Sequence, residues 1–368
     1  MSDAYAAAGV DTGQADRGVA ALVEVLAAID PGRSRLAVDL PGHYASVLRV
    51  APNLGIALGT DSVGSKVIVA EQADRFDTIG IDCVAMNVND LICVGAEPLA
   101  MLDYLAVEQA DPRMLGEIAA GLRAGAEAAG IEIPGGELCQ IPEVLRGHPS
   151  PNGFDLVGSA FGTVALDRIV DGSACRPGDV LIGLPASGVH SNGLTLARRA
   201  LLEDGGLGLA ARPPELGGAS VADTLLEPTV IYVRAIMALL DSDAAVHGLA
   251  HITGGGLLNL LRIGSGVGYR IDAPLPVPGV FELIARLGQV PVAEMWQVFN
   301  MGCGFVAITG PADAEEAVRL LSEYHPGAAV IGQLTGETGR IELTGLGVAG
   351  DAGGLRGPRR EPDEAGGT

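Results

Sequence analysis

The mixed order of helix-like and strand-like segments most constrains what this chain can fold into. In the first half, residues 79–94 are apolar at helical spacing, and an alanine-rich helix is predicted at residues 117–129, where Gly130 would end it. Strands are predicted around these helices, at residues 54–58, 67–69, 99–107 and 154–164.

The second half repeats this mixture. It opens with a predicted buried strand at residues 180–184, and a composition break at residues 167–172 precedes it. The predicted elements that follow are helices at residues 192–203, 228–240 and 312–324, an apolar segment at 257–263 and a strand at 305–308. The order predicts two α/β or α+β domains, residues 1–168 and 169–346. Gly, Pro and charges replace apolar residues near the end, so residues 347–368 are expected to be a disordered tail.

Composition excludes several classes of protein. With 368 residues and 48% hydrophobic residues, the chain can bury a sizeable core. Its formal net charge of −22 argues against nucleic acid as a partner, because binding to a phosphate backbone needs clustered Lys and Arg. No apolar run approaches the length of a membrane span, and the N-terminus lacks the features of a signal peptide. The 5 scattered cysteines suit reduced thiols, so we expect a cytoplasmic protein.

The chain has a single lysine, Lys66, beside 22 arginines. It follows a Gly/Ser-rich stretch that includes Gly64 and Ser65, whose backbone N–H groups could bind an anion. A compact ammonium suits phosphate, and Asp61 could hold the divalent cation that a polyphosphate brings. The alternative is that Lys66 is a solvent-facing charge at the start of an amphipathic strand.

Asp90 lies within the apolar helical run, where a carboxylate is costly unless a cation or hydrogen bonds accompany it. A metal shared with Asp61 would meet that need. The alternative is that Asn89 and Asp90 form the solvated edge of an amphipathic helix. Asp103 and Glu137 are further acids flanked by apolar or glycine residues.

Two loops of the second half combine a histidine with small polar residues before a helix. Such a loop places unpaired N–H groups and the positive end of a helix near an anion. One histidine alone is more often structural than catalytic, but two similar loops are harder to dismiss. The loops contain Ser187, Gly188, His190, Ser191 and Asn192 in one case, and His251, Thr253 and Gly254 in the other.

Short motifs that include these residues follow one another along residues 5–345. They include Gly-Gly-Glu at 135–137 and Phe-Asn-Met-Gly at 299–302. The others are at residues 5–11, 59–66, 77–82, 89–91, 95–98, 102–104, 188–193, 226–229 and 250–257. As an ordered set they resemble the aminoimidazole ribonucleotide (AIR) synthetase family, the phosphoribosylformylglycinamidine cyclo-ligases of purine synthesis.

The resemblance implies a fold and a reaction. The N-terminal strands would form a barrel at a homodimer interface, and ATP would lie in a cleft. The reaction would use ATP and Mg²⁺ to activate the formamide oxygen of a phosphorylated substrate as an iminophosphate, after which an internal nitrogen closes the imidazole ring and phosphate leaves.

The resemblance also implies residue roles. Asp61, Asp90 and Glu137 would be magnesium ligands, and Lys66 a catalytic phosphate contact. His251 would transfer a proton or stabilise the oxygen under attack, and His190 would act beside it. Nucleotide contacts would include Gly64, Ser65, Asn89 and Asp103, and substrate or phosphate contacts would be Ser187, Gly188, His190, Ser191, Asn192, Thr253 and Gly254.

Some positions depart from the family's usual residues. Gln140 replaces an acid and Gln297 an Arg, so we expect these two side chains to be spatial neighbours whose charges were lost together. The other departures are Leu138, Ser62 and Ser65. They leave open a paralogous ATP-dependent enzyme that activates another amide or phosphorylated small molecule. A non-catalytic ligand-binding dimer is a further alternative, although it would have little use for Lys66, Asp61 and Asp90.

Overall fold

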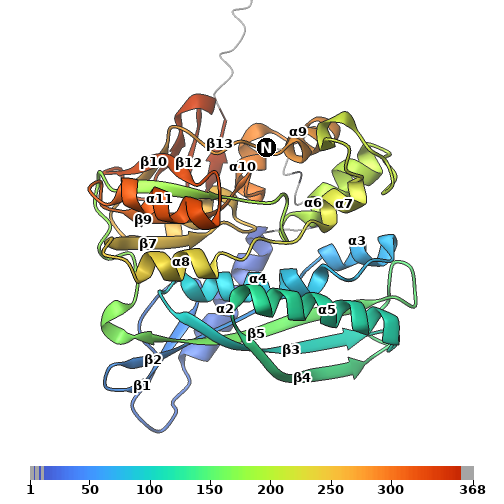
Figure 1. The fold of residues 1–368 in the computed structure, drawn as a ribbon, viewed down its shortest axis with the longest axis horizontal. Coiled ribbons are helices and arrows are strands. Elements are labelled where there is room, and N and C mark those ends of the chain that lie inside the picture. Colours follow the sequence, from blue (N-terminus) through green and yellow to red (C-terminus); the bar gives the residue numbers. More distant parts are fainter. Residues whose placement is uncertain (1–3, 5–7, 10–11, 358–368) are drawn as a thin grey trace, which may run out of the picture.

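Two β-sheets, each with its own helices, form the two halves of the molecule (Figure 1). The structure is a computed structural model that describes residue 4, residues 8–9 and residues 12–357. The first sheet has five strands in the order β1-β2-β5-β3-β4. Their bounds are β1 Ser46–Ala51, β2 Leu54–Ser62, β3 Glu97–Val107, β4 Glu132–Gln140 and β5 Phe154–Ala165.

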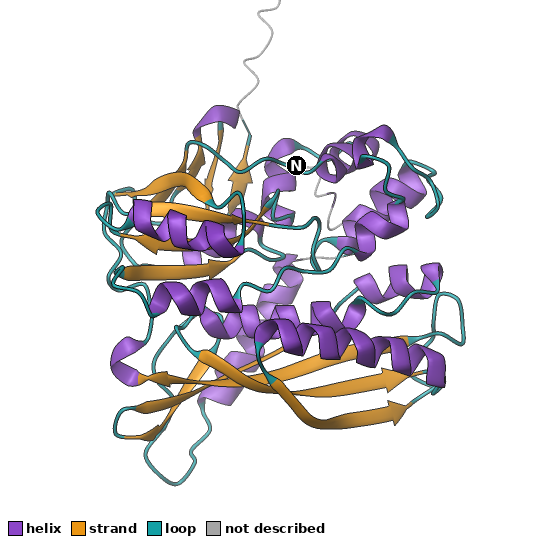
Figure 2. Cartoon of the chain, viewed as in Figure 1, coloured by secondary structure: helices purple, strands orange, loops and turns teal. Residues whose placement is uncertain are grey.

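Helices cover one face of this sheet, on the side toward the second domain (Figure 2). They are α3 (Lys66–Ala73), α4 (Ile79–Ile92) and α5 (Pro112–Ala129). Asp111 caps α5 by accepting the N–H of Met114, and Gly130 ends it in the left-handed conformation. Gly80 of α4 lies against the backbone of α5, where any Cβ would collide with it, so the two helices pack closely.

The opposite face of the first sheet carries uncovered apolar side chains. Strand register places Leu102 and Tyr104 of β3 on this face, beside Ser159 and Val157 of β5. Leu102 and Tyr104 are 41% and 40% exposed, and Leu54 of β2 is 41% exposed. The N-terminal helix α2 (Thr12–Ala27) likewise exposes apolar side chains: Val19, Leu22, Val23, Val25 and Leu26.

The second sheet has eight strands in the order β13-β12-β11-β8-β10-β6-β9-β7. Its strands are β6 Val180–Pro185, β7 Val246–His251, β8 Gly268–Ile271, β9 Cys303–Thr309, β10 Ala329–Thr335, β11 Ile341–Leu343, β12 Val348–Asp351 and β13 Gly354–Arg356. Its helices are α6 Leu194–Arg198, η2 Arg199–Asp204, η3 Pro214–Leu216, α7 Val221–Leu226, α8 Val233–Leu240, η4 Gly256–Arg262, α9 Gly279–Leu287, α10 Val292–Val298 and α11 Ala314–Tyr324, with the short turns η1 Leu166–Arg168 and η5 Thr344–Leu346. All residues of β9 are buried, because it lies between β6 and β7.

The two-domain mixed fold is confirmed, but two local predictions were wrong. The strand expected at residues 67–69 is helix α3, which buries Lys66, Val67, Val69, Ala70 and Glu71 and therefore shows no one-sided apolar pattern. The tail expected from residue 347 contains β12 and β13, which pack on α10, while residues 358–368 lie outside the described residues. In the described part of the chain, no helix is long and apolar enough to cross a membrane.

Candidate active site

The Lys66 loop of the first domain lies against the His190 loop of the second. The hydroxyl of Ser191 donates to the carbonyl oxygen of Val63 over 2.8 Å. The hydroxyls of Ser65 and Thr195 are 2.9 Å apart. Two segments that the sequence singled out separately therefore meet where the domains join.

Lys66 is fully buried, and its ammonium binds a carboxylate of the same domain. Its Nζ lies 2.9 Å from Oδ1 and 2.8 Å from Oδ2 of Asp82, and it donates to the carbonyl oxygen of Glu227 over 2.6 Å. The solvent-facing alternative is thus wrong. A phosphate contact by Lys66 stays a prediction, and it would require the ammonium to leave Asp82.

Asp61 and Asp90 face each other closely enough to repel. Burial raises the pKa of Asp61 to about 6, with a further contribution from the charge of Asp90, while the N–H of Ser62 and the charge of His251 act in the opposite direction. Asn87 fixes the backbone of Asp61, because its side chain accepts the N–H of Asp61 and donates to the Asp61 carbonyl. Two such carboxylates together could bind a divalent cation.

His251 reaches this acidic pair from β7. Its Nδ1 is 2.8 Å from Oδ1 of Asp90, and its ring stacks on Phe305 with centroids 6.2 Å apart. With the carboxylate as acceptor, Nδ1 is the donor and Nε2 offers its lone pair. This buried Nε2 has no hydrogen-bond partner among the described residues.

His190 has the complementary tautomer. Its Nε2 accepts the N–H of Ser187 over 3.2 Å, which leaves the hydrogen on Nδ1. That Nδ1 is buried and unpartnered within the described part of the chain. Burial first, and then the charges of His251 and Lys66, hold the pKa of His190 well below its usual value, so the ring stays neutral. Its φ of 63° places it in the left-handed region, where a non-glycine residue is strained.

A row of residues across the first sheet connects Asp61 to a cavity. Register aligns Asp61 with Gly158, Gly158 with Asp103, and Asp103 with Gly136. Asp61 and Asp103 are thus two strands apart, or about 10 Å. Gly158 leaves room for Asn87 between them, and a Cβ at Gly136 would collide with the Asp103 carboxylate.

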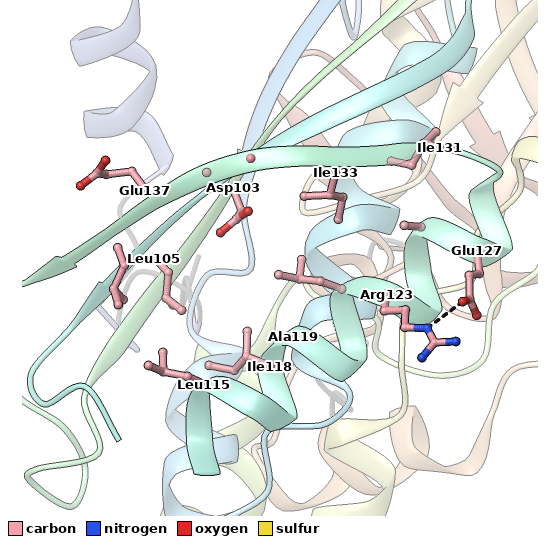
Figure 3. A pocket seen from close by; sticks show the side chains of 15 residues that line it. Asp103, Leu105, Leu115, Ile118, Ala119, Arg123, Glu127, Ile131, Ile133 and Glu137 are labelled. Carbon is pink, nitrogen blue, oxygen red and sulfur yellow. Dashed lines mark hydrogen bonds and ion pairs between the residues drawn. The ribbon is translucent and has the colours of Figure 1, made fainter. Parts of the chain in front are cut away.

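The cavity lies between α5 and strands β3 and β4, and its volume is about 660 Å³ (Figure 3). Asp103 points into it, whereas Glu137 points away (Figure 3). Burial raises the pKa of Asp103. Most of the wall is apolar: Leu105, Leu115, Ile118, Leu122, Ile131 and Ile133.

Family models match both halves of the chain. The model described as AIR synthase related protein, N-terminal domain, matches residues 42–164, and the corresponding C-terminal domain matches residues 176–343. This chain belongs to the AIR synthase family.

Curated relatives agree with the assignment to the AIR synthase family. The chain is 46% identical over 346 residues to the phosphoribosylformylglycinamidine cyclo-ligase of Thermococcus gammatolerans, covering 93% of this chain and 98% of the relative. It is 48% identical over 304 residues to that of Methanothermobacter thermautotrophicus, covering 82% and 86%.

Solved structures show the same fold at lower identity. Hydrogenase maturation protein HypE in complex with ATP has a TM-score of 0.58 at 21% identity, covering 84% of this chain and 86% of that one. Thermotoga maritima PurL complexed with FGAR has a TM-score of 0.57 at 18% identity, covering 84% and 46%.

The structure does not assemble every residue predicted for this AIR synthase site. Glu137 is exposed on the edge strand β4, opposite Tyr104, so register places it on the other face of the sheet from Asp61 and Asp103. No cluster of three or more His, Cys, Asp or Glu able to hold a metal occurs among the described residues, and the three-carboxylate magnesium site is therefore not formed within one chain. Asn89 is engaged elsewhere: its amide donates to Val230 and accepts from Tyr232.

The expected neighbours Gln140 and Gln297 lie in different domains, so their pairing within one chain is wrong. Gln140 ends β4, and Gln297 of α10 accepts the N–H of Leu355 in the C-terminal hairpin. The remaining substrate candidates line the His190 and His251 loops. Asn192 lies beside Gly254, the N–H of Thr253 donates to Asn259, and the hydroxyl of Ser187 donates to Pro228.

Sequence reasoning missed Asp82, Asn87 and Thr229 as site residues. The hydroxyl and N–H of Thr229 donate to Oδ1 of Asp82 over 2.6 and 2.8 Å. Asp82 stands in an apolar helical run as Asp90 does, so the same argument about a buried carboxylate would have found it.

Proposed function

We propose that this chain is a phosphoribosylformylglycinamidine cyclo-ligase, which uses ATP to convert formylglycinamidine ribonucleotide to 5-aminoimidazole ribonucleotide, ADP and phosphate. The observation that carries the proposal is identity of 46% to a cyclo-ligase along 93% of the chain. The convergence of Asp61, Asp90, His190 and His251 at the domain junction supports it. Such a set suits an enzyme better than a ligand-binding dimer.

The chemistry of Asp61 and Asp90 fits Mg²⁺. A divalent cation bound to these two neighbouring carboxylates, one of which has a pKa raised to about 6, would offset the repulsion between their charges. Bound there, Mg²⁺ would neutralise charge on the phosphates of ATP. Glu137 could join such a site only from another subunit or after a rearrangement, because it faces away from Asp61.

The cavity beside Asp103 suits the base of ATP. Its apolar walls from α5 can stack on a purine, and the Asp103 carboxylate can accept hydrogen bonds from an amino group. ATP would then lie along the row of residues from Gly136 and Asp103 to Asp61, with its base in the cavity and its phosphates toward the domain junction. Gly64 and Ser65 would contact these phosphates there through their backbone N–H groups.

The two histidines have distinct roles in this proposal. His251 accepts a proton at Nε2 as the internal nitrogen of the substrate attacks the activated formyl carbon and phosphate leaves, and Asp90 stabilises the charge that the imidazole gains. Neutral His190 donates from Nδ1 to the substrate or its phosphate. Asn192, beside Gly254, contacts the substrate, while Ser191 fixes the His190 loop through its bond to Val63.

We also propose a cytoplasmic homodimer in which the open faces of two five-stranded sheets meet and close a barrel. Exposed Leu102 and Tyr104 of β3 support this arrangement, because a soluble monomer rarely leaves neighbouring large apolar side chains in water. The second copy would cover them.

Incubation with formylglycinamidine ribonucleotide and MgATP tests the activity. We expect ADP, phosphate and a product with the ultraviolet absorption of an aminoimidazole. Turnover should fall sharply in Asp90→Asn, while Asp167→Asn, an exposed carboxylate outside the site, serves as the control. If formylglycinamidine ribonucleotide does not react and ATP hydrolysis is instead coupled to a different amide, the protein is a paralogous ATP-dependent enzyme and the proposal is wrong.

A further inference from the structure

A buried cluster that includes Lys66 joins the two domains directly behind the proposed site. The Lys66 cluster consists of Lys66, Asp82, Thr229 and the carbonyl group of Glu227. Lys66 and Asp82 belong to the first domain, and Thr229 and Glu227 to the second. The side chains of Lys66 and Asp82 are 0% exposed and Thr229 is 2% exposed, so water does not compete for these bonds.

We propose that Asp82 and Thr229 are positioning residues, which hold Lys66 across the domain junction and thereby fix the loop before Lys66, and the end of β2 with Asp61, relative to His190. The structural part of this inference is independent of the reaction, and only its effect on turnover rests on the proposed function.

Hydrogen bonds within the cluster are complementary. The ammonium of Lys66 donates to Oδ1 of Asp82 and to the Glu227 carbonyl, and it lies 2.8 Å from Oδ2 of Asp82 as an ion pair. Oδ1 of Asp82 in turn accepts the hydroxyl and N–H of Thr229. A buried pair of this kind adds fixed geometry more dependably than it adds stability, because desolvation offsets the attraction between the charges.

Both loops of the site are connected to this cluster. On one side, Lys66 directly follows Gly64 and Ser65 in the short loop after β2, the strand that carries Asp61. On the other, the N–H of Val230, next to Thr229, points to Nε2 of His190 over 3.5 Å. The hydroxyl of Ser187, in the His190 loop, also donates to the carbonyl of Pro228. A shift of Thr229 would therefore move the partners that set the tautomer and orientation of His190.

The lone lysine provides a direct measurement. Since Lys66 carries the only ε-amino group of the chain, the rate at which an amine-reactive reagent modifies it in the folded protein reports how often the cluster opens. Peptide mass spectrometry separates this site from the α-amino group. No substrate is needed, so the result does not depend on the proposed activity.

The decisive comparison is Thr229→Val against Thr229→Ser, because Val keeps the shape but removes the hydroxyl and Ser restores it. Loss of a hydrogen bond to a buried carboxylate should raise the modification rate of Lys66 by about tenfold or more. If the enzyme is the proposed cyclo-ligase, kcat should fall by about tenfold while the KM for ATP changes less than about threefold. Ser should restore both values.

Arg75→Ala is the matched control. Arg75 also binds across the domains, to Asp223 over 2.6 Å, but both side chains are 43% exposed. Neither Lys66 modification nor kcat should change in this variant, since exposed ion pairs contribute little.

Two results would overturn the inference. One is a Thr229→Val protein in which Lys66 is modified at the wild-type rate. The other is faster modification with kcat unchanged in an enzyme shown to be active, which would mean that the cluster does not position the site.

Discussion

Asp61→Asn should stabilise the ligand-free protein at neutral pH, although it removes a residue of the site. The folded chain keeps the Asp61 carboxylate buried and near Asp90, which raises its pKa to about 6. The unfolded chain exposes it to water with an ordinary pKa. Ionisation of Asp61 therefore costs folding free energy, and an amide avoids that cost.

The sign and size follow from proton linkage. Because the folded pKa is the higher one, the favourable contribution is complete below the unfolded value of 3.8 and is lost as the pH rises through about 6. A difference of roughly two pKa units corresponds to about 3 kcal/mol in total. Of this, about 2 kcal/mol should be lost between about pH 4.5 and about pH 7.5.

Denaturant unfolding of the wild type and the variant across this pH range measures the effect. The free energy of unfolding of Asp61→Asn, minus that of the wild type, should grow with pH by the amount above. Asp167→Asn removes an equal charge from an exposed position and should show no such trend. Addition of MgCl₂ at neutral pH should stabilise the wild type more than Asp61→Asn, since only the wild type keeps both carboxylates. A difference that stays constant with pH would refute the reasoning, because it would mean that Asp61 is not desolvated beside Asp90.

Three further predictions concern the cavity, His251 and the open sheet face. Gly136→Ala should weaken ATP binding and destabilise the fold by about 1–3 kcal/mol, because its Cβ collides with Asp103. Gly135→Ala is the control and should be tolerated, because no atom lies within 4 Å of its Cβ position. Calorimetry measures ATP binding, and denaturant unfolding measures stability. His251→Gln should lower kcat by roughly 10²–10⁴-fold with little change in the KM for ATP. The control His148→Gln, at an exposed position, should leave kcat unchanged. Equal losses of ATP binding and of kcat in His251→Gln would instead indicate a structural role. Leu102→Asp should dissociate the proposed dimer, as measured by light scattering. The control Val330→Asp changes a residue of the other sheet that is 46% exposed, and it should leave the dimer intact. A monomeric wild type would contradict the proposed barrel.

The long periodic segment at residues 79–94 and the buried strands at residues 180–184 and 305–308 were predictable from sequence, whereas the short run after Lys66 was not. The helix expected at residues 79–94 is α4, because its apolar positions face the sheet and α5 on a repeat that sequence displays. The short apolar run after Lys66 fits a strand as well as a helix, and contacts from both domains decide for α3. The composition of the C-terminal hairpin does not predict strands, because its order depends on pairing with β11 and on contacts with α10, which include the bond from Leu355 to Gln297.

The candidate site also has features that the sequence could predict and features that it could not. Residue types singled out Asp61, Asp90 and the two histidine loops, and the structure brings Asp90 and His251 into contact. They could not supply the partners themselves: Asp82 is 16 residues from Lys66, and Thr229 is 147 residues from Asp82. The unusual lysine was noticed for a charge suited to phosphate, and the structure pairs that charge with a carboxylate instead.

The edge strand β4 has a consequence for newly made chains. An unpaired edge next to an apolar sheet face is a template for aggregation of newly made chains. In β4, Pro134 lacks an N–H donor, Gly135 and Gly136 weaken strand pairing, and the register with β3 is irregular between Ala100 and Leu102. Glu132 and Glu137 add negative charge along the same strand. Pro134 and Gly135 thus disfavour edge-to-edge pairing of free chains, so a variant with β-branched residues at positions 134 and 135, which leaves Gly136 in place, should yield less soluble protein.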